Sequence, residues 1–258
     1  MKGNTMNPFR IEENRAKYAD SKNYAALKST YNRNYPEIKD ANTSKLWNKL
    51  NLEFKESEDN NPMARDRIAI VASWLSVNKK KILNIGFGSG NLEEKLLQND
   101  GHDEWHGIDI SPVSVKEASK LYNNGKFRTG SVIDLPYNNS YFDSCALLEV
   151  LEHIKPSQTF IVLKEVSRVL KKGGILVISV PLNENLEQMA SQGTNPNAHI
   201  RVYTPELIKA ELEIANFKII KEKKLFAFNS QYFIKSVIVN LLPFLRQPNN
   251  IIIYAQKS

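Results

Sequence analysis

Three glycines between an apolar run and a helical pattern are the first residues whose spacing suggests chemistry. Gly86, Gly88 and Gly90 follow the apolar run 82–85, and leucines recur at helical spacing after them. Glycines permit a tight strand-to-helix turn and let a ligand lie close to the backbone. A dinucleotide fingerprint would need its third glycine at Asn91. The turn therefore indicates a nucleotide-like ligand without identifying it, and a glycine turn without a ligand is the alternative.

Two aspartates stand where the next two strand patterns end. Asp109 follows the glycines at a distance suited to a carboxylate that accepts from both ribose hydroxyls. Asp134 follows the third strand pattern, where a carboxylate can accept from an exocyclic amine such as that of adenine. A capping aspartate at 109 and a turn aspartate at 134 are the alternatives.

Two histidines that follow later strand patterns are candidates for a general base. His153 ends the segment EVLEH, and His199 begins the segment HIRVY. A base contributes about 10²- to 10⁴-fold when an acceptor must lose a proton. If the second segment is extended, Arg201 and Tyr203 share a face with His199, which predicts acceptor contacts or lid fasteners. A structural role is the alternative for His153, and because no histidine–cysteine cluster has metal-ligand spacing, we expect no metal.

The elements that must position these residues alternate between strand and helix patterns. The predicted strands cover 82–85, 105–108, 127–131, 144–148 and 175–180, and the helices between them cover 91–98, 112–122 and 156–170. This alternation is typical of a parallel sheet with helices on both faces, an α/β fold. In such a sheet the ligand lies at the carboxyl ends of the strands, where the candidate residues stand.

Residues 1–62 are predicted to form an N-terminal helical extension, and residues 63–258 a catalytic domain. The extension is polar, with helices expected at 24–31 and 44–54 and a loop at 56–62. The catalytic domain carries an apolar insertion at 229–250.

Composition narrows the class of protein. The chain has 258 residues, a formal charge of +7 and one cysteine, Cys145, which excludes an intrachain disulfide framework. The first thirty residues show no apolar signal core, and no apolar run is long enough to span a membrane. We therefore expect a cytoplasmic protein, whose positive charge reflects either an anionic partner or a lysine-rich surface.

Six segments, in this order, resemble class I S-adenosylmethionine-dependent methyltransferases of the small-molecule branch (types 11 and 23). They are ILNIGFGSGN, GIDISPVSV, GSVIDLPY, FDSCALLEVLEHI, LKEVSRVLKKGGILVISVP and HIRVYTPELIKAELEIANF. The resemblance implies a Rossmann-like sheet of seven strands in the order 3-2-1-4-5-7-6, with the last strand antiparallel. It also implies S-adenosylmethionine as cofactor and a small-molecule acceptor, methylated on oxygen or nitrogen, with a glycan or lipid-linked metabolite among the candidates.

The resemblance assigns cofactor contacts residue by residue. The glycines would shape the turn under the methionine, and Asp109 would hold the ribose. Ile110 would pack on the adenine, whose amine Asp134 would bind beside the backbone of Ile133. The backbone around Leu148 would face the methionine amino group. The full set is Asn84, Gly86, Gly88, Gly90, Asp109, Ile110, Ile133, Asp134 and Leu148.

One position departs from the family pattern. Asn84 stands where the family usually has Asp or Glu, a carboxylate that helps to bind the ammonium group of the cofactor. An amide oxygen can still accept a hydrogen bond. This departure keeps open a second hypothesis, that the protein resembles a methyltransferase and binds the cofactor without catalysing turnover.

An RNA methyltransferase is the second alternative. Its support is the positive charge, but Lys79–Lys81 and Lys171–Lys172 precede predicted strands and so lie on the edge opposite the cofactor. The motif after the fourth strand, LEVL, also lacks the Asn-Pro-Pro-Tyr-like tetrapeptide of nucleic-acid amino-methyltransferases. A nucleic-acid substrate is therefore not favoured.

The segment 229–250 is predicted to form an apolar lid over the acceptor. Phe233, Val237, Leu241 and Phe244 recur at helical spacing, and Pro243 should end or kink the helix. The alternatives are a helix that docks on the body or forms a homodimer contact, and a peripheral membrane contact that would suit a lipid-linked acceptor.

Overall fold

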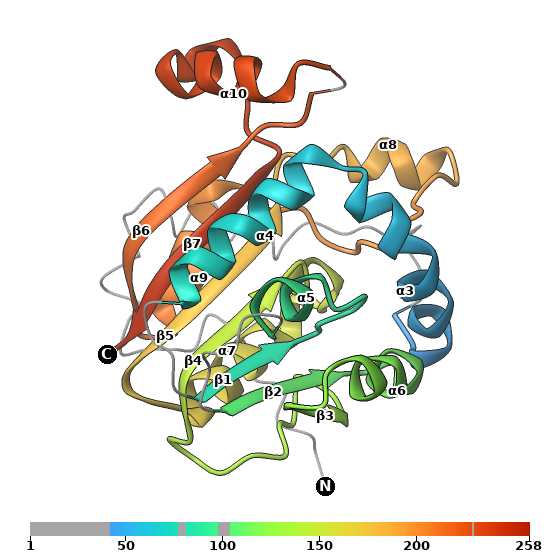
Figure 1. Cartoon of the computed structure of the whole chain (residues 1–258). Helices are drawn as coiled ribbons and strands as arrows, with labels where there is room; N and C mark the ends of the chain where they lie inside the picture. The colour runs from blue at the N-terminus through green and yellow to red at the C-terminus, as the bar shows by residue number, and fades with distance from the viewer. Residues whose placement is uncertain (1–41, 77–80, 98–103, 229) are drawn as a thin grey trace, which may run out of the picture.

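The computed structural model describes residues 42–76, 81–97, 104–228 and 230–258 (Figure 1). The helix predicted at 24–31 lies outside the described residues. Among the helices that the model describes, none combines the length and the apolar character needed to cross a membrane.

A seven-stranded sheet forms the centre of the fold, in the order β3-β2-β1-β4-β5-β7-β6 (Figure 1). The strands β1 to β5 pair in parallel, and β7 is antiparallel to both β5 and β6. This confirms the predicted order and the antiparallel last strand. The strands are β1 (Lys81–Ile85), β2 (Glu104–Asp109), β3 (Gly125–Thr129), β4 (Phe142–Leu148), β5 (Leu170–Pro181), β6 (Phe217–Leu225) and β7 (Asn250–Lys257).

Helices cover the sheet and line one of its edges. The α-helices are α3 (Ser44–Asp59), α4 (Pro62–Leu75), α5 (Asn91–Leu97), α6 (Pro112–Leu121), α7 (Thr159–Val169), α8 (Leu186–Ser191), α9 (Pro205–Ile214) and α10 (Tyr232–Leu241). Short 3-10 turns are η2 (Leu151–His153), η3 (Pro156–Gln158) and η4 (Pro243–Leu245).

Two apolar cores, one on each face, hold the helices to the sheet. Along β5, Leu176 and Ile178 belong to the core shared with α7 and α9, whereas Val177 belongs to the core shared with α4 and α5. Side chains of successive strand residues point to opposite faces, so a continuous apolar run is what a strand covered on both faces requires.

Helix starts follow the polar residues and prolines in the sequence. Ser111 caps α6 by accepting from the backbone of Ser114, and Thr204 caps α9 in the same way. In both helices a proline occupies the first turn, where no backbone donor is required.

Several element boundaries differ from the prediction, and β5 begins at Leu170 instead of residue 175. The third strand spans Gly125–Thr129, not 127–131, because the chain turns after Thr129 and the amide of Gly130 donates to the carbonyl of Asp109. Helix α3 continues to Asp59, through the segment that the sequence predicts as a loop. The turn falls instead at Asn61, which caps α4.

Candidate functional site

A cavity of about 770 Å³ opens at the carboxyl ends of the parallel strands. Its volume falls in the range of about 300–1,000 Å³ that is usual for small-molecule and cofactor sites. Asn84, Asp109, Leu148 and Pro181 line it from the ends of β1, β2, β4 and β5. Asn250 reaches the same edge because β7 runs in the opposite direction.

The lysine clusters lie at the other edge of the sheet, as predicted, where the structure describes them. Lys81 begins β1 and pairs with Glu104, and Lys171 near the start of β5 pairs with Asp143. A polyanion bound there would be far from the cavity.

The glycine turn forms one wall of the cavity. Gly86, Gly88 and Gly90 have φ angles of +69°, +58° and +84°, a region that side chains disfavour. A Cβ at Gly86 would lie 2.6 Å from the Val150 side chain, so that position has no room. A Cβ at Gly88 would meet nothing closer than 3.7 Å, and Gly88 lines the cavity. Gly90 belongs to the turn but does not line the cavity.

Asp109 ties the glycine turn to the end of β2. Its carboxylate accepts from the amides of Gly88 at 2.9 Å and Ser111 at 2.8 Å. Burial raises the pKa of Asp109, and the two amide hydrogen bonds oppose that rise. Each oxygen keeps a further lone pair, which is what a ribose diol would need. The carboxylate therefore stands where the sequence predicts it, with its orientation fixed by the backbone.

Two isoleucines provide apolar surface beside Asp109. Ile110 and Ile133 are exposed to 40% and 37%, and both line the cavity. Exposed apolar side chains next to a carboxylate match an adenosine, which has a flat base and a polar sugar.

Asp134 is not in the cavity. Its side chain is exposed and does not line the cavity, whereas the preceding residues Ser131, Val132 and Ile133 do. The reason is the early end of β3, after which a turn bridged between Ser131 and Asp134 carries the aspartate outward. The structure therefore does not support the adenine contact predicted for Asp134.

Asn84 has a buried carboxylate as its partner. Its amide nitrogen donates to Oε1 of Glu93 at 2.8 Å, and Trp105 Nε1 donates to the same oxygen at 3.2 Å. Burial raises the pKa of Glu93 to about 7. The family usually has an acidic residue at position 84. In this protein the acidic residue is Glu93 on α5, which accepts a hydrogen bond from the amide nitrogen of Asn84. The amide oxygen of Asn84 can still act as an acceptor.

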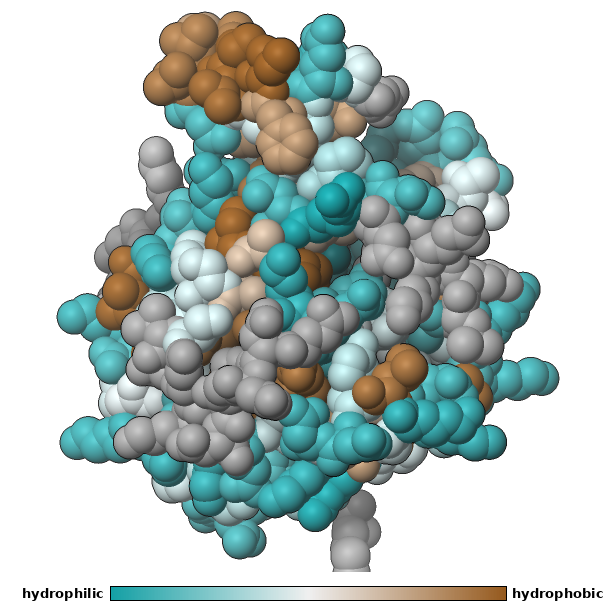
Figure 2. Space-filling model, in the orientation of Figure 1, coloured by the Kyte–Doolittle hydropathy of each residue, from teal (hydrophilic) through white to brown (hydrophobic). Residues whose placement is uncertain are grey.

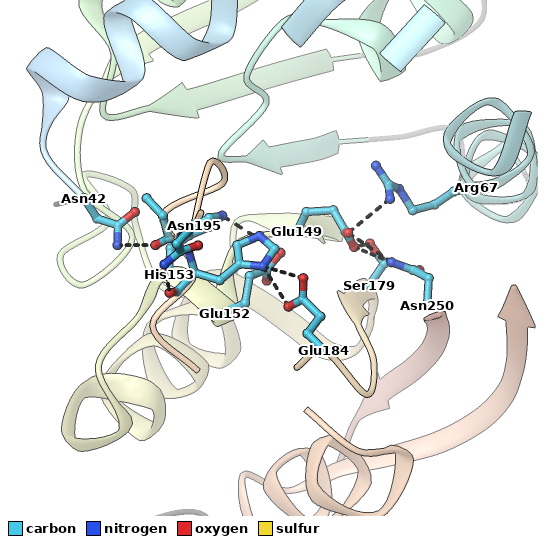
Figure 3. A network of polar contacts seen from close by, with 11 residues as sticks. Asn42, Arg67, Glu149, Glu152, His153, Ser179, Glu184, Asn195 and Asn250 are labelled. Carbon is cyan, nitrogen blue, oxygen red and sulfur yellow. Dashed lines mark hydrogen bonds and ion pairs between the residues drawn. The ribbon is translucent and has the colours of Figure 1, made fainter. Parts of the chain in front are cut away.

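Glu149 organises the part of the cavity that follows β4 (Figure 3). Its carboxylate accepts from Ser179 Oγ at 2.7 Å and from Asn250 Nδ2 at 2.9 and 3.0 Å. It also pairs with Arg67 Nη1 at 3.1 Å. Glu149 has a φ of +53°, which is uncommon outside glycine and concentrates at functional sites. The sequence analysis gave Glu149 no role, although it directly follows a strand.

A histidine cluster lies next to Glu149 (Figure 3). The rings of His153 and His199 pack edge to face with centroids 4.8 Å apart. His199 Nδ1 lies 2.7 and 2.9 Å from the oxygens of Glu184, and His153 Nδ1 lies 3.4 Å from the carbonyl of Ala198. Carboxylates and carbonyls only accept, so Nδ1 is the donor in both rings, and in the neutral imidazole Nε2 carries no proton.

Glu152 completes this cluster. It is fully buried, and neither of its carboxylate oxygens has a hydrogen-bond partner among the described residues. Burial, with the charges of Glu149 and Glu184 nearby, raises the pKa of Glu152 well above its usual range. Glu152, His153 and His199 bring their ligand atoms within 4.8 Å of one another. The sequence spacing does not reveal this grouping, because the prediction of no metal rests on histidine–cysteine clusters alone.

Arg201 and Tyr203 have a structural role, which corrects the predicted acceptor contacts. Both are fully buried, and Arg201 pairs with Glu211 and donates to Tyr203 and Thr159. Burial does alternate from His199 to Tyr203, as the period of two requires. The shared face points into the protein, however, and only His199 reaches the cavity.

The segment before residue 62 contributes to the site. Asn42, Trp47 and Asn51 line the cavity, and Trp47 packs on the ring of His153. Asn51 also donates to Ser114 at the start of α6. The predicted boundary at residue 62 thus separates two parts of the sequence, but residues from both parts line the cavity.

Helix α10 projects beyond the end of the sheet next to β6 and β7 (Figures 1 and 2). None of its residues is among those that line the cavity. Phe233, Leu241 and Phe244 are exposed to 76%, 75% and 81%, and they form part of an apolar tip beyond the ends of β6 and β7. Tyr232 anchors the helix by donating to Asp66 at 2.9 Å. Among the described residues, α10 therefore forms neither the predicted lid nor an apolar wall of the cavity.

Comparison with known proteins identifies the domain. Residues 83–178 match a family model described as a methyltransferase domain. In the solved structure of an S-adenosylmethionine-dependent methyltransferase from Archaeoglobus fulgidus, 94% of the chain aligns with 74% of this one, with a TM-score of 0.55 and 20% identity. Residues 83–178 thus match a methyltransferase domain, and the chain shares the fold of S-adenosylmethionine-dependent methyltransferases.

Relatives of known function match over part of their length. A demethylmenaquinone methyltransferase from Thermotoga maritima is 29% identical over 126 residues, 49% of this chain and 54% of the relative. A ubiquinone biosynthesis O-methyltransferase from Marinobacter nauticus is 29% identical over 153 residues, 57% of this chain and 60% of the relative. The chain thus spans little more than half of each. The [4+2]-cyclase SpnF shares the fold as well, with a TM-score of 0.56 and 20% identity, so the fold alone does not fix the reaction.

The residues around the cavity fit the cofactor of this domain class. Gly88 leaves open space where a side chain would project, Asp109 offers acceptors, and Ile110 and Ile133 offer an apolar surface. These residues, with Asn84, would hold S-adenosylmethionine.

Proposed function

We propose that this protein transfers a methyl group from S-adenosylmethionine to a small-molecule acceptor at the histidine end of the cavity. The observation that carries the proposal is one continuous cavity that joins the glycine turn to the His199–Glu184 pair. The relatives named above, one of which is an O-methyltransferase, support it.

The chemistry makes few demands on the protein. When bound, S-adenosylmethionine supplies a methyl group on a sulfonium, which an acceptor attacks in line. Positioning the two reactants contributes about 7–11 kcal/mol of the barrier. In the metal-free protein, His199 serves as the general base. Glu184 accepts a hydrogen bond from its Nδ1–H, so that the unprotonated Nε2 can take a proton from the methyl acceptor. His153 supports the ring of His199 at 4.8 Å.

We infer an acceptor with a hydroxyl or amino group and a partly apolar body. Trp47, Met63 and Ile68 line the cavity as apolar surface, and Glu149 and Glu184 provide polar contacts. A nucleic acid is not favoured, since Lys81 and Lys171 are at the opposite edge and paired with acids. A cytoplasmic location is part of the same proposal.

Calorimetry and a donor assay test the proposal together. The full chain should bind S-adenosylmethionine and its demethylated product, and labelled methyl should transfer to a member of a library of phenols, quinols, sugars and amines. Cofactor binding with no transfer to any acceptor would favour a binding protein without turnover. Transfer to a mixed RNA pool that persists at moderate salt would favour the RNA alternative, because phosphate contacts weaken steeply as salt rises.

We also propose that the apolar tip, which we define as the exposed apolar residues of α10 and η4, touches a membrane surface near a lipid-linked acceptor. Lys235 and Arg246 flank the tip and pack on the Phe228 ring, where they can face anionic headgroups. The tip lies on the edge where the cavity opens, since Ala227 and Asn249 at its base line the cavity. A homodimer that covers the tip is the competing possibility.

Changing Phe233 and Phe244 to serine tests the membrane contact. Both side chains are exposed, so we expect stability to change by less than about 0.5 kcal/mol for each. Flotation with vesicles that contain anionic lipid should fall severalfold, while Leu121→Ser, at an exposed leucine on α6, should leave it unchanged. Loss of a dimer on gel filtration with unchanged flotation would assign the tip to a second copy.

A further inference from the structure

The cluster around Glu152 has the composition and geometry of a metal site. Glu152, His153 and His199 each offer one ligand atom, and the three atoms lie within 4.8 Å of one another. Two imidazoles and one carboxylate are a donor set that zinc uses in catalytic sites, with a fourth position kept open. The ligands around a tetrahedral zinc lie about 3.4 Å apart, given bonds of about 2.0–2.2 Å, so closing on an ion needs only small side-chain movements.

The buried carboxylate of Glu152 is an independent observation that points to a cation. Its two oxygens have no hydrogen-bond partner among the described residues, although the side chain is fully buried. Nearby Glu149 is balanced by Arg67 and Glu184 by His199, whereas the distance from Glu152 Oε1 to His153 Nε2 is 4.0 Å. A buried unpaired carboxylate is costly unless a proton or a metal ion compensates it.

The histidines are oriented as metal ligands usually are. A ligating histidine typically donates its other ring nitrogen to a carboxylate or a backbone carbonyl, which fixes its tautomer. His199 donates Nδ1–H to Glu184, and His153 donates Nδ1–H to the carbonyl of Ala198. Asn42 and Asn195 hold this loop, through the carbonyl of Ala198 and the backbone of His199 (Figure 3).

We propose that Glu152, His153 and His199 bind a divalent metal ion of borderline softness, such as zinc, with one coordination position open to the cavity. His153 and His199 line the cavity, while Glu152 lies behind them, which places the open position on the acceptor side. Two imidazoles make zinc a better fit than magnesium or calcium, which prefer oxygen ligands.

Its role rests on the proposed function. An acceptor hydroxyl bound to the ion loses its proton to solvent at neutral pH, as zinc-bound water does. The oxygen electron pair then forms the new O–CH₃ bond while the bond from the methyl carbon to the sulfonium breaks, and its electrons remain on sulfur. In the metal-loaded protein His199 is a ligand, and the base role described above belongs to the metal-free protein.

Metal binding by the full chain tests the site without reference to activity. Protein stripped with a chelator is titrated with Zn²⁺ alone, and bound metal is measured by mass spectrometry after dialysis. We expect one zinc per chain, and a loss of affinity of at least about tenfold in both Glu152→Gln and His199→Ala. His106→Gln is the matched control, since His106 pairs with Glu104 at the start of β2 and should keep wild-type zinc binding.

Thermal unfolding of the stripped protein separates a metal role from a structural one. Removing a buried carboxylate that accepts no hydrogen bond among the described residues should raise the midpoint of Glu152→Gln above that of wild type without metal. Zinc should raise the midpoint of wild type and not that of the variant. Absence of stoichiometric zinc in wild type, binding retained in Glu152→Gln, or a lower metal-free midpoint of that variant would each overturn the proposal.

Cofactor titration of the same samples keeps the two proposals distinguishable. S-adenosylmethionine binding without zinc binding overturns the metal site alone. Stoichiometric zinc without methyl transfer to any acceptor supports the site and overturns the proposed methyl transfer.

Discussion

In the half of the cavity assigned to the cofactor, contacts come from strand ends and from the turns that follow them. Asp109 and Gly88 are joined through the backbone, and their positions follow from where β1 and β2 end. In the acceptor half, side chains from distant segments meet: Glu149 is held by Arg67 on α4 and by Asn250 on β7. Local sequence thus determines the first half, and tertiary packing the second.

The effect expected at Gly88 would break the comparison if absent. Gly88→Val should lower cofactor affinity beyond about 100-fold, because the side chain projects into the cavity from a residue with φ of +58°. Gly193→Val is the matched control, since Gly193 has φ of +64° and open space around its Cβ. Both should lose about 1–2 kcal/mol of stability, the cost of the left-handed conformation. Calorimetry measures the affinity, and equal affinities in both variants would contradict the assignment of the turn.

The next effect belongs to the acceptor half. In assays of metal-free protein, His199→Ala should lower kcat by about 10²- to 10⁴-fold, because it removes the base. Cofactor affinity should stay near the wild-type value, since His199 lies at the other end of the cavity. Kinetics with titration of the cofactor measure both. A comparable loss of cofactor affinity would show that the two halves are not separable.

A third effect concerns the buried carboxylate of the cofactor half. Burial raises the pKa of Glu93 to about 7, so the folded protein holds its proton at pH values where the unfolded chain, at about 4.5, has lost it. Stability should therefore fall by about 3 kcal/mol as the pH rises from about 4.5 to about 7. Glu93→Gln should remove this part of the pH dependence in chemical denaturation. An equally steep profile in the variant would locate the titration elsewhere.

What the sequence predicted and what it missed follow the same division, except for Asp134, which the turn after β3 carries out of the cavity. The glycine turn and Asp109 depend on periodicity and on residues that directly follow strands, whereas the strand order was implied by the family resemblance, and the structure has all three in place. Arg201 and Tyr203 were misassigned because a period of two identifies a shared face but not whether that face meets solvent, a cavity or the core.

Other parts of the site had no local signal in the sequence. The pairing of Arg67 with Glu149 and the meeting of Glu152 with His199 join residues far apart in the chain, which no spacing rule connects. The apolar helix α10 was predicted correctly as a helix, but its packing was not, since a hydrophobic face specifies no partner.

The place of β7 in the sheet has a consequence for the order in which the protein folds. β5 and β6 follow one another in the chain, yet β7 lies between them and pairs with both. During synthesis β6 therefore has no partner strand, and one edge of β5 stays open, until residues 250–257 have been made. Asn250, which holds Glu149, opens β7, so the acceptor half is assembled in the same step that closes the sheet.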